Sequence, residues 1–212
     1  MTTQLRKQKD EERRMRTRSK LLDAAASVFA RQGFHRALIS DIVSQAGVGQ
    51  GTFYRNFASK REVFEALFDR LVATLLSEFG PMSDRLPMNL LEYREASRSV
   101  IRRMAATVDR NRELFLLLMR QAPSVDAKFA QKVQDTYDRF AQMAQFYLDH
   151  AVAQGFARPC RSQLVAQALV GIAVRTVDLW LADRLPVESL EDAIEDLVDF
   201  AFTGFQKEKD NA

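Results

Sequence analysis

Apolar residues recur at intervals of three or four along most of the 212-residue chain, which is the spacing of one face of an α-helix. Leu21, Ala25 and Phe29 form such a face, and Gly33 follows as a residue type that commonly ends a helix. No run alternates apolar and polar residues between hairpin turns, as strands with one exposed face do. The pattern therefore predicts an all-α protein of about nine helices.

Two short helical patterns lie close together in residues 40–60, which read SDIVSQAGVGQGTFYRNFASK. In the first pattern Ile42 and Ala46 are four residues apart and therefore share one face. Phe53 and Phe57 share a face of the second pattern in the same way. We expect these four side chains to point inward and the remaining side chains of the second helix to face solvent.

Cap and turn residues predict where these helices begin and end. The Ser40 side chain can cap the first helix, and Gly47 can take the left-handed conformation that reverses the chain. Ser59 and Glu62 have the spacing of a capping box, so a new helix is expected to start at Lys60. The layout is that of a helix-turn-helix, whose second helix lies in the DNA major groove.

The outward face of the second helix carries side chains that suit DNA bases. Glutamine can pair with adenine, arginine with guanine, and a threonine methyl can contact thymine, so Gln50, Thr52 and Arg55 are candidate base contacts. Because Gly51 has no side chain, the amides at the helix N-terminus can approach a phosphate closely. The candidate phosphate contacts are Ser40, Gly51, Tyr54, Asn56 and Lys60.

The sequence AGVGQGTFYRNFASK, preceded by LLDAAASVFARQGF, resembles the DNA-binding domain of the TetR family of transcriptional regulators over roughly residues 13–68. Many members carry Ser or Thr where Gly49 stands and His or Tyr where Asn56 stands, which affects individual phosphate contacts. From about Leu71 onward the chain shares only the family's habit of a divergent, all-helical ligand-binding domain. The resemblance implies a homodimeric repressor that a small molecule releases from a palindromic double-stranded DNA operator.

The distribution of charge agrees with a DNA-binding N-terminal end. Residues 1–70 hold 14 Lys and Arg against 8 Asp and Glu, a net charge of +6, whereas residues 71–212 sum to −3. The cations ahead of the first apolar face form either a solvated extension or an arm that contacts phosphates. They are Arg6, Lys7, Lys9, Arg13, Arg14, Arg16, Arg18 and Lys20.

These observations divide the chain into a flexible basic extension at residues 1–12, a DNA-binding domain at 13–60, and an effector-binding and dimerisation domain at 61–212. The helix that starts at Lys60 continues towards Phe79 and so belongs to two domains. A shift at its far end would move the DNA-binding helix, which is a physical route for control by a ligand.

Helical patterns at residues 89–109, 112–120 and 124–154, together with the helix after Lys60, would enclose a largely apolar effector cavity, as in the family. Aromatic and Met side chains at helical spacing also occur as plain core, and an arginine in an apolar helix can simply pair with a neighbour such as Asp178. The aromatic and apolar side chains in these helices would favour an apolar or aromatic effector. The candidate pocket residues are Phe115, Leu118, Met119, Tyr137, Phe140, Tyr147 and Arg175.

The last two helices, expected at residues 162–183 and 189–206, carry more apolar surface than one inward face needs. Either they cap a monomer, or two copies pair across a two-fold axis as a four-helix bundle, which we favour. The candidate dimer contacts are Leu164, Ala168, Gly171, Ile172, Trp180, Leu190, Ile194, Leu197, Ala201 and Phe205.

The sequence offers little material for catalysis. His35 and His150 are the only histidines, and we find no metal-ligand cluster, phosphate-binding loop or nucleophile elbow, so no metal or cofactor is expected. The single cysteine, Cys160, fits a reducing compartment, and we expect a cytoplasmic protein. The rival interpretations are a helical interaction protein and an enzyme whose catalytic groups lie in the cavity.

Overall fold

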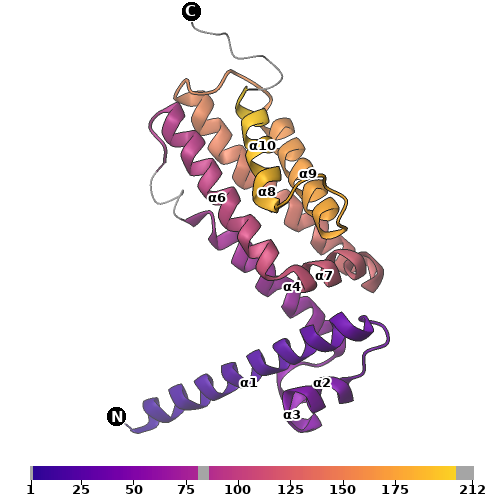
Figure 1. Ribbon diagram of the computed structural model, residues 1–212. Helices are drawn as coiled ribbons and strands as arrows, with labels where there is room; N and C mark the ends of the chain where they lie inside the picture. The colour runs from indigo at the N-terminus through magenta and orange to yellow at the C-terminus, as the bar shows by residue number, and fades with distance from the viewer. Residues whose placement is uncertain (1, 81–85, 204–212) are drawn as a thin grey trace, which may run out of the picture. The chain divides into compact units, whose positions relative to one another are not determined.

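The computed structural model describes residues 2–80 and 86–203, and every regular element in these two ranges is a helix (Figure 1). The all-α prediction is therefore confirmed. The helices are α1 Thr2–Gln32, α2 Ile39–Ala46, α3 Gln50–Asn56, α4 Lys60–Ser77, α6 Leu90–Arg110, α7 Arg112–Val125, α8 Ala127–Ala153, α9 Ser162–Leu181 and α10 Leu190–Thr203.

The helices form two compact units. Unit 1 consists of residues 1–72 and 116–131, and unit 2 of residues 73–115 and 132–212. This division differs from the boundary expected near residue 60, because α4 and the junction of α7 with α8 contribute residues to the same unit as the N-terminal helices. Sequence spacing alone gave no sign of that contribution.

Aromatic packing explains why residues 116–131 belong to unit 1. Phe64 of α4 packs against Phe29 and Phe34 at ring-centroid distances of 5.8 and 4.9 Å. The same ring lies 5.3 Å from Phe129 of α8, which in turn lies 5.2 Å from Phe68. Each such pair contributes about 0.5–1.5 kcal/mol beyond burial of its area. The five rings therefore join four parts of the chain into one core.

The basic N-terminal extension is helical. Residues 4–16 are exposed along α1, which continues without a break to the buried residues Leu21 and Ala25. Arg18, which follows the extension on the same helix, donates from Nη1 to the Asn56 carbonyl at 2.7 Å, and its guanidinium lies 4.0 Å from the Phe57 ring centroid. Arg18 thus fixes α1 against the end of α3.

Polar contacts join the α7–α8 junction to the rest of unit 1. The Arg61 guanidinium donates to the Asp126 carboxylate at 2.5 and 3.4 Å and to Glu65 at 2.7 Å. Asp126 also accepts from the Phe129 amide at 2.8 Å, which caps the start of α8. The hydrogen bond from Arg61 is the main cause that lowers the pKa of Asp126 to about 2.

In unit 2, α10 lies beside both α6 and α9 (Figure 1). Arg94 and Arg98 of α6 both donate to Asp199 of α10, at 2.7 and 2.5 Å, and Arg102 donates to Glu195 at 2.6 Å. The arginines are four residues apart, so they form a row along one side of α6. This ladder of ion pairs fixes the register between the two helices.

The Asp126 contact generates a pH-dependent prediction. Asp126→Asn removes the charge that Arg61 stabilises, so the variant should be less stable than the parent at pH 7. A carboxyl with a depressed pKa stabilises the fold above its ordinary pKa of about 4 and loses this effect as the pH falls through about 2. The difference in free energy of unfolding should therefore shrink between these values, as denaturant unfolding at several pH values will show.

Asp196→Asn is the control for this prediction because the Asp196 side chain is exposed on α10. It should leave the free energy of unfolding close to that of the parent at every pH. A constant difference between Asp126→Asn and the parent from pH 7 to pH 2 would contradict the assigned role of the Arg61 contact.

Candidate nucleic-acid interface

Helices α1, α2 and α3 pack against one another, and the turn between α2 and α3 is the one that the sequence predicts. Gly47 has φ of +64°, and its amide donates to the Ser44 carbonyl at 3.2 Å, which ends α2. Ile42 and Phe53 are fully buried and Phe57 is 1% exposed. The expected helix-turn-helix is confirmed, and three of its four expected inward side chains are buried, whereas Ala46 is half-buried.

The N-terminus of α2 differs from the expectation. Leu38 precedes the helix, and the Asp41 carboxylate accepts from its amide at 3.1 Å. Ser40 lies inside the first turn and is exposed, so it does not cap the helix as predicted. Its hydroxyl faces solvent at the start of α2, where it remains a candidate phosphate contact.

The exposed side of α3 carries the candidate base contacts. Gln50 and Arg55 are exposed and Thr52 is half-buried. Arg55 Nη2 donates to Thr52 Oγ1 at 2.9 Å, so the structure brings two of the three candidates together. Tyr54 is 54% exposed, and its ring contacts the Phe53 ring edge-to-face at a centroid distance of 5.5 Å.

Two candidate phosphate contacts, Asn56 and Lys60, also make hydrogen bonds within unit 1. Asn56 Nδ2 donates to the Thr52 carbonyl at 2.8 Å. Lys60 Nζ donates to the carbonyls of His35 and Ala37 at 3.0 and 2.8 Å, and desolvation lowers its pKa. An ammonium group has three N–H donors, so these two bonds leave one donor of Lys60 for another acceptor.

The two glycines near the start of α3 are not required by the packing of the protein itself. A Cβ atom built on Gly49 or Gly51 would have no neighbouring atom within 4 Å, and neither residue has a positive φ. At the other end of α3, Ser59 Oγ accepts from the Glu62 amide at 3.2 Å, which confirms the predicted cap of α4. Glu62 reaches back to the amide of Ala58, at 2.6 Å, rather than to that of Ser59.

The candidate effector residues divide between the two units. Leu118 and Met119 belong to unit 1, whereas Phe115, Tyr137, Phe140, Tyr147 and Arg175 belong to unit 2. Within unit 2 the Phe79 ring lies 6.3 Å from both Phe140 and Tyr147, and it stacks on Tyr147 at 10°.

Two other candidate effector residues have different surroundings. Burial is the main cause that raises the pKa of Tyr137 on α8. The Arg175 side chain is 60% exposed and pairs with Asp178 of the same helix, as the simpler interpretation of the sequence proposes.

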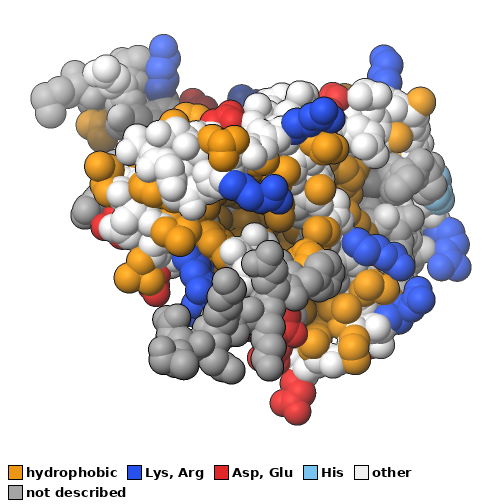
Figure 2. Space-filling view, turned by 90° about the horizontal axis from the view of Figure 1, so that it is seen from above, with side chains coloured by type: hydrophobic (Ala, Val, Ile, Leu, Met, Phe, Trp, Pro, Cys, Tyr) orange, Lys and Arg blue, Asp and Glu red, His pale blue; other side chains and the backbone are white. Residues whose placement is uncertain are grey.

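Helix α9 is apolar and largely uncovered in the single chain. By length and composition it could cross a membrane, with a mean hydropathy of 1.6 and only 11% of its residues buried. Leu164 is 63% exposed and Ile172 is 37% exposed, and the small residues Ala168 and Gly171 are exposed as well. Hydrophobic side chains also gather between Lys and Arg on the face shown in Figure 2.

The candidate dimer contacts on α10 are placed differently. Leu190 and Ile194 are 3% and 7% exposed, so they belong to the core of unit 2 and not to an open face. Leu197 is half-buried, as is Trp180 on α9, and Ala201 is exposed. Phe205 lies outside the described residues.

Two family models match the chain. Residues 21–67 match bacterial regulatory proteins of the tetR family, and residues 94–204 match the tetracyclin repressor-like C-terminal domain. The chain belongs to the TetR family. This family consists of transcriptional regulators that bind DNA and are not enzymes, which agrees with the sequence analysis.

Similar proteins agree with this membership. The chain is 25% identical over 187 residues to the transcriptional activator FasR of Mycolicibacterium smegmatis. This match covers 88% of this chain and 82% of FasR. FadR of Bacillus subtilis in complex with stearoyl-CoA has the same fold, with a TM-score of 0.74 and 18% identity over 89% of this chain and 99% of that one. FadR of Thermus thermophilus in complex with lauroyl-CoA also has this fold, with a TM-score of 0.66 and 20% identity. The match covers 92% of this chain and 98% of that one.

The turn between α2 and α3 generates a second prediction. Gly47→Ala must place a Cβ at a positive φ in open space, so the cost is conformational alone, about 1 kcal/mol in the free energy of unfolding. Gly51→Ala is the control, because its site is equally open, has no positive φ and lies inside α3 and not at its N-cap. Urea unfolding of the two variants should separate them, and equal stabilities would contradict the role assigned to Gly47.

Proposed function

We propose that this TetR-family regulator is a cytoplasmic, sequence-specific repressor whose α3 reads DNA bases in the major groove. The observation that carries the proposal is the exposed side of α3, where Gln50, Thr52 and Arg55 lie on a helix whose other side is buried. Such side chains form specific hydrogen bonds or methyl contacts with base edges. Ser40, Gly51, Tyr54, Asn56 and Lys60 would hold the sugar-phosphate backbone.

The exposed part of α1 would add phosphate contacts. Its cations project from a helix that Arg18 fixes to the end of α3, so the helix has a defined direction relative to the base-reading residues. A regular helix is a better match to a row of phosphates than to the minor groove, which typically accepts extended arms. We therefore propose contact with phosphates and no reading of bases by this segment.

We also propose that two copies pair through α9. Its exposed apolar residues and small residues allow close approach of a second helix, and a long apolar helix left open to water is unfavourable. Two DNA-binding units on one dimer would contact two half-sites of a palindrome. Binding by both units gives the affinity that a single short helix lacks.

For the effector we propose a fatty acyl-CoA. Two proteins with the same fold were solved with stearoyl-CoA and lauroyl-CoA, and an acyl chain matches the apolar effector that the sequence favours. The rings of Phe79, Phe140 and Tyr147 in unit 2 provide apolar surface for such a chain. Effector binding would favour a state whose two recognition helices no longer match the operator, which lowers affinity for DNA.

Substitution of a base contact and substitution of a phosphate contact should change DNA binding in different ways. Arg55→Ala should chiefly relax specificity, by about 1–3 kcal/mol at one base pair, because a base contact is lost. Tyr54→Phe and Lys60→Ala should weaken binding to operator and unrelated DNA alike. Fluorescence anisotropy with operator, single-base variants and random DNA measures these affinities.

Arg139→Ala, which removes an exposed cation from α8, is the control and should leave DNA affinity unchanged. An equal loss of affinity for all DNA sequences in the Arg55, Tyr54 and Lys60 variants would contradict the division into base and phosphate contacts.

The pairing of two copies makes a fourth prediction. Ile172→Glu places a charge in the exposed apolar surface of α9 and should convert the dimer to a monomer with at least about tenfold weaker operator binding. Leu91→Glu is the matched control, since Leu91 is 69% exposed on α6, and it should remain dimeric. Light scattering after size-exclusion chromatography measures the mass, and a dimeric Ile172→Glu variant would refute pairing through α9.

A further inference from the structure

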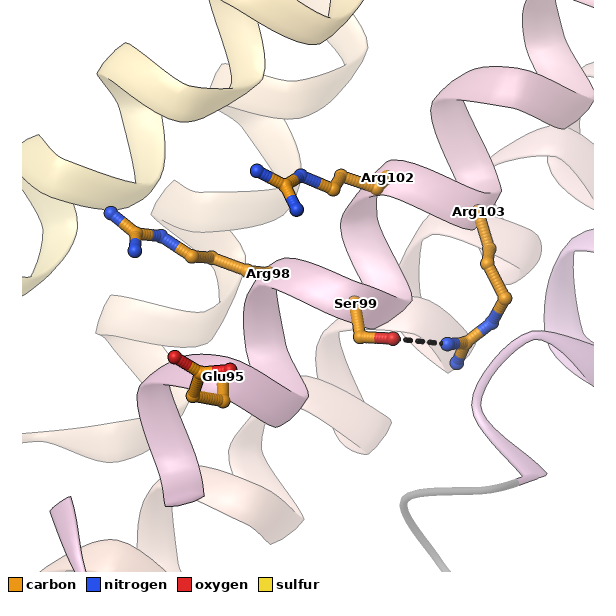
Figure 3. Close-up of a pocket in the computed structure, with 5 residues that line it drawn as sticks. All are labelled: Glu95, Arg98, Ser99, Arg102 and Arg103. Atoms are coloured by element: carbon orange, nitrogen blue, oxygen red, sulfur yellow. Dashed lines mark hydrogen bonds between the residues drawn. The ribbon is translucent and has the colours of Figure 1, made fainter. Parts of the chain in front are cut away.

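A recess of about 400 Å³ lies on the surface of α6 in unit 2 (Figure 3). This volume lies within the range of about 300–1,000 Å³ that is typical of sites for small molecules. The residues that line it are Glu95, Arg98, Ser99, Arg102 and Arg103. Its three arginines also pair with carboxylates outside this lining, those of Glu78, Glu191, Glu195 and Asp199, so a ligand must compete for them.

The arginines of the recess point to two sides. Figure 3 shows Arg98 and Arg102 directed away from Arg103, with Ser99 between them. Arg103 Nη1 donates to Ser99 Oγ at 2.5 Å, so the hydroxyl and this guanidinium already form one polar group. Arg98 Nε is buried and makes no hydrogen bond within the described residues, although the Glu195 carboxylate lies 3.3 Å away.

Each side of the recess is linked to another helix. On one side Arg98 and Arg102 bind the carboxylates of α10 that form the ladder described above. On the other side Arg103 binds Glu78, the residue that follows α4, with Nη2 2.7 Å from its carbonyl and Nε 3.1 Å from its carboxylate. Thr107, which is fully buried, also donates to the Glu78 carboxylate at 3.3 Å.

We propose that this recess binds the phosphate groups of a coenzyme A thioester, which deepens and rests on the acyl-CoA response proposed above. Guanidinium groups form bidentate, charge-assisted hydrogen bonds with phosphate oxygens, and a serine hydroxyl can donate a further one. A free phosphate has the same chemistry, so the two sources must be separated by experiment. The fatty acyl chain itself would find no apolar lining among these five residues.

The arrangement links binding to the position of α4. A phosphate that accepts hydrogen bonds from Arg103 competes with Glu78, whose carbonyl and carboxylate hold the end of α4 in unit 2. The ligand would therefore favour the state in which this contact is broken. Because α4 also carries Lys60 and Arg61 of unit 1, the recess provides a chemical route from effector to DNA-binding unit.

Isothermal titration of the full chain with coenzyme A, pantetheine and inorganic phosphate tests the proposal. Ser99→Asp places a carboxylate beside Arg103, and Ser99→Asn is the neutral variant of nearly equal shape. Coenzyme A should bind Ser99→Asp about tenfold more weakly than Ser99→Asn, because a charge-assisted contact is lost. Ser99 is exposed, so neither substitution disturbs a core.

Pantetheine, which has no phosphate, should bind both variants equally and more weakly than coenzyme A. Arg103→Lys should also weaken coenzyme A binding, since an ammonium cannot replace the planar fork. Equal affinities of the two Ser99 variants for coenzyme A would overturn the proposal. Inorganic phosphate that binds as tightly as coenzyme A would identify a free-phosphate site and overturn the assignment to the effector.

Operator binding by the parent and by the two Ser99 variants distinguishes failure of the phosphate site from failure of the proposed function. The carboxylate of Ser99→Asp should occupy Arg103 without any ligand and lower operator affinity relative to Ser99→Asn. A parent protein that binds no operator would defeat the proposed function. Normal operator binding, together with identical behaviour of the two Ser99 variants, would defeat the phosphate site alone.

Discussion

The burial of Phe53 and Phe57 is the contact on which the DNA-binding surface depends. A helix of seven residues such as α3 is too short to be stable in water by itself, so its position must come from packing. Both rings are almost completely buried, and Arg18 holds the carbonyl at the end of the same helix. The remaining side of α3 is thereby presented to solvent with a fixed orientation.

Helix α4 extends this constraint to the rest of the chain. Its first turn is held in unit 1 by Lys60, which bonds two backbone carbonyls, and by Arg61, which bonds Asp126. The chain directly after it is held in unit 2 by Arg103 through Glu78. Polar contacts therefore anchor the start of α4 in unit 1 and the residue after its end in unit 2.

Local signals in the sequence predicted the helix-turn-helix well. Gly47, the spacing of Phe53 and Phe57, and the Ser59 cap each act within a few residues, so spacing reveals them. Contacts between distant residues carry no such signal. The bonds from Arg18 to Asn56 and from Arg61 to Asp126, which join distant segments of unit 1, therefore emerge only from the fold.

The charged extension is helical, and the end of α7 was predicted incorrectly. A run of charge suggested flexibility, yet residues 2–32 contain no glycine or proline, so α1 can continue through them. Pro123 suggested a break after residue 120, whereas α7 continues to Val125 and Asp126 caps the next helix. In both cases the residues that cap or interrupt a helix, and the packing of its ends, determine its length more than the composition does.

The most direct test of the account is to incubate the purified protein with fragmented DNA from its own genome at near-physiological salt, with and without lauroyl-CoA, and to sequence the retained fragments. The account predicts enrichment of an inverted repeat whose half-sites are about one DNA turn or a near multiple apart, and its loss when lauroyl-CoA is present. Retention of fragments without a shared sequence under both conditions would contradict the claim that α3 reads an operator under effector control.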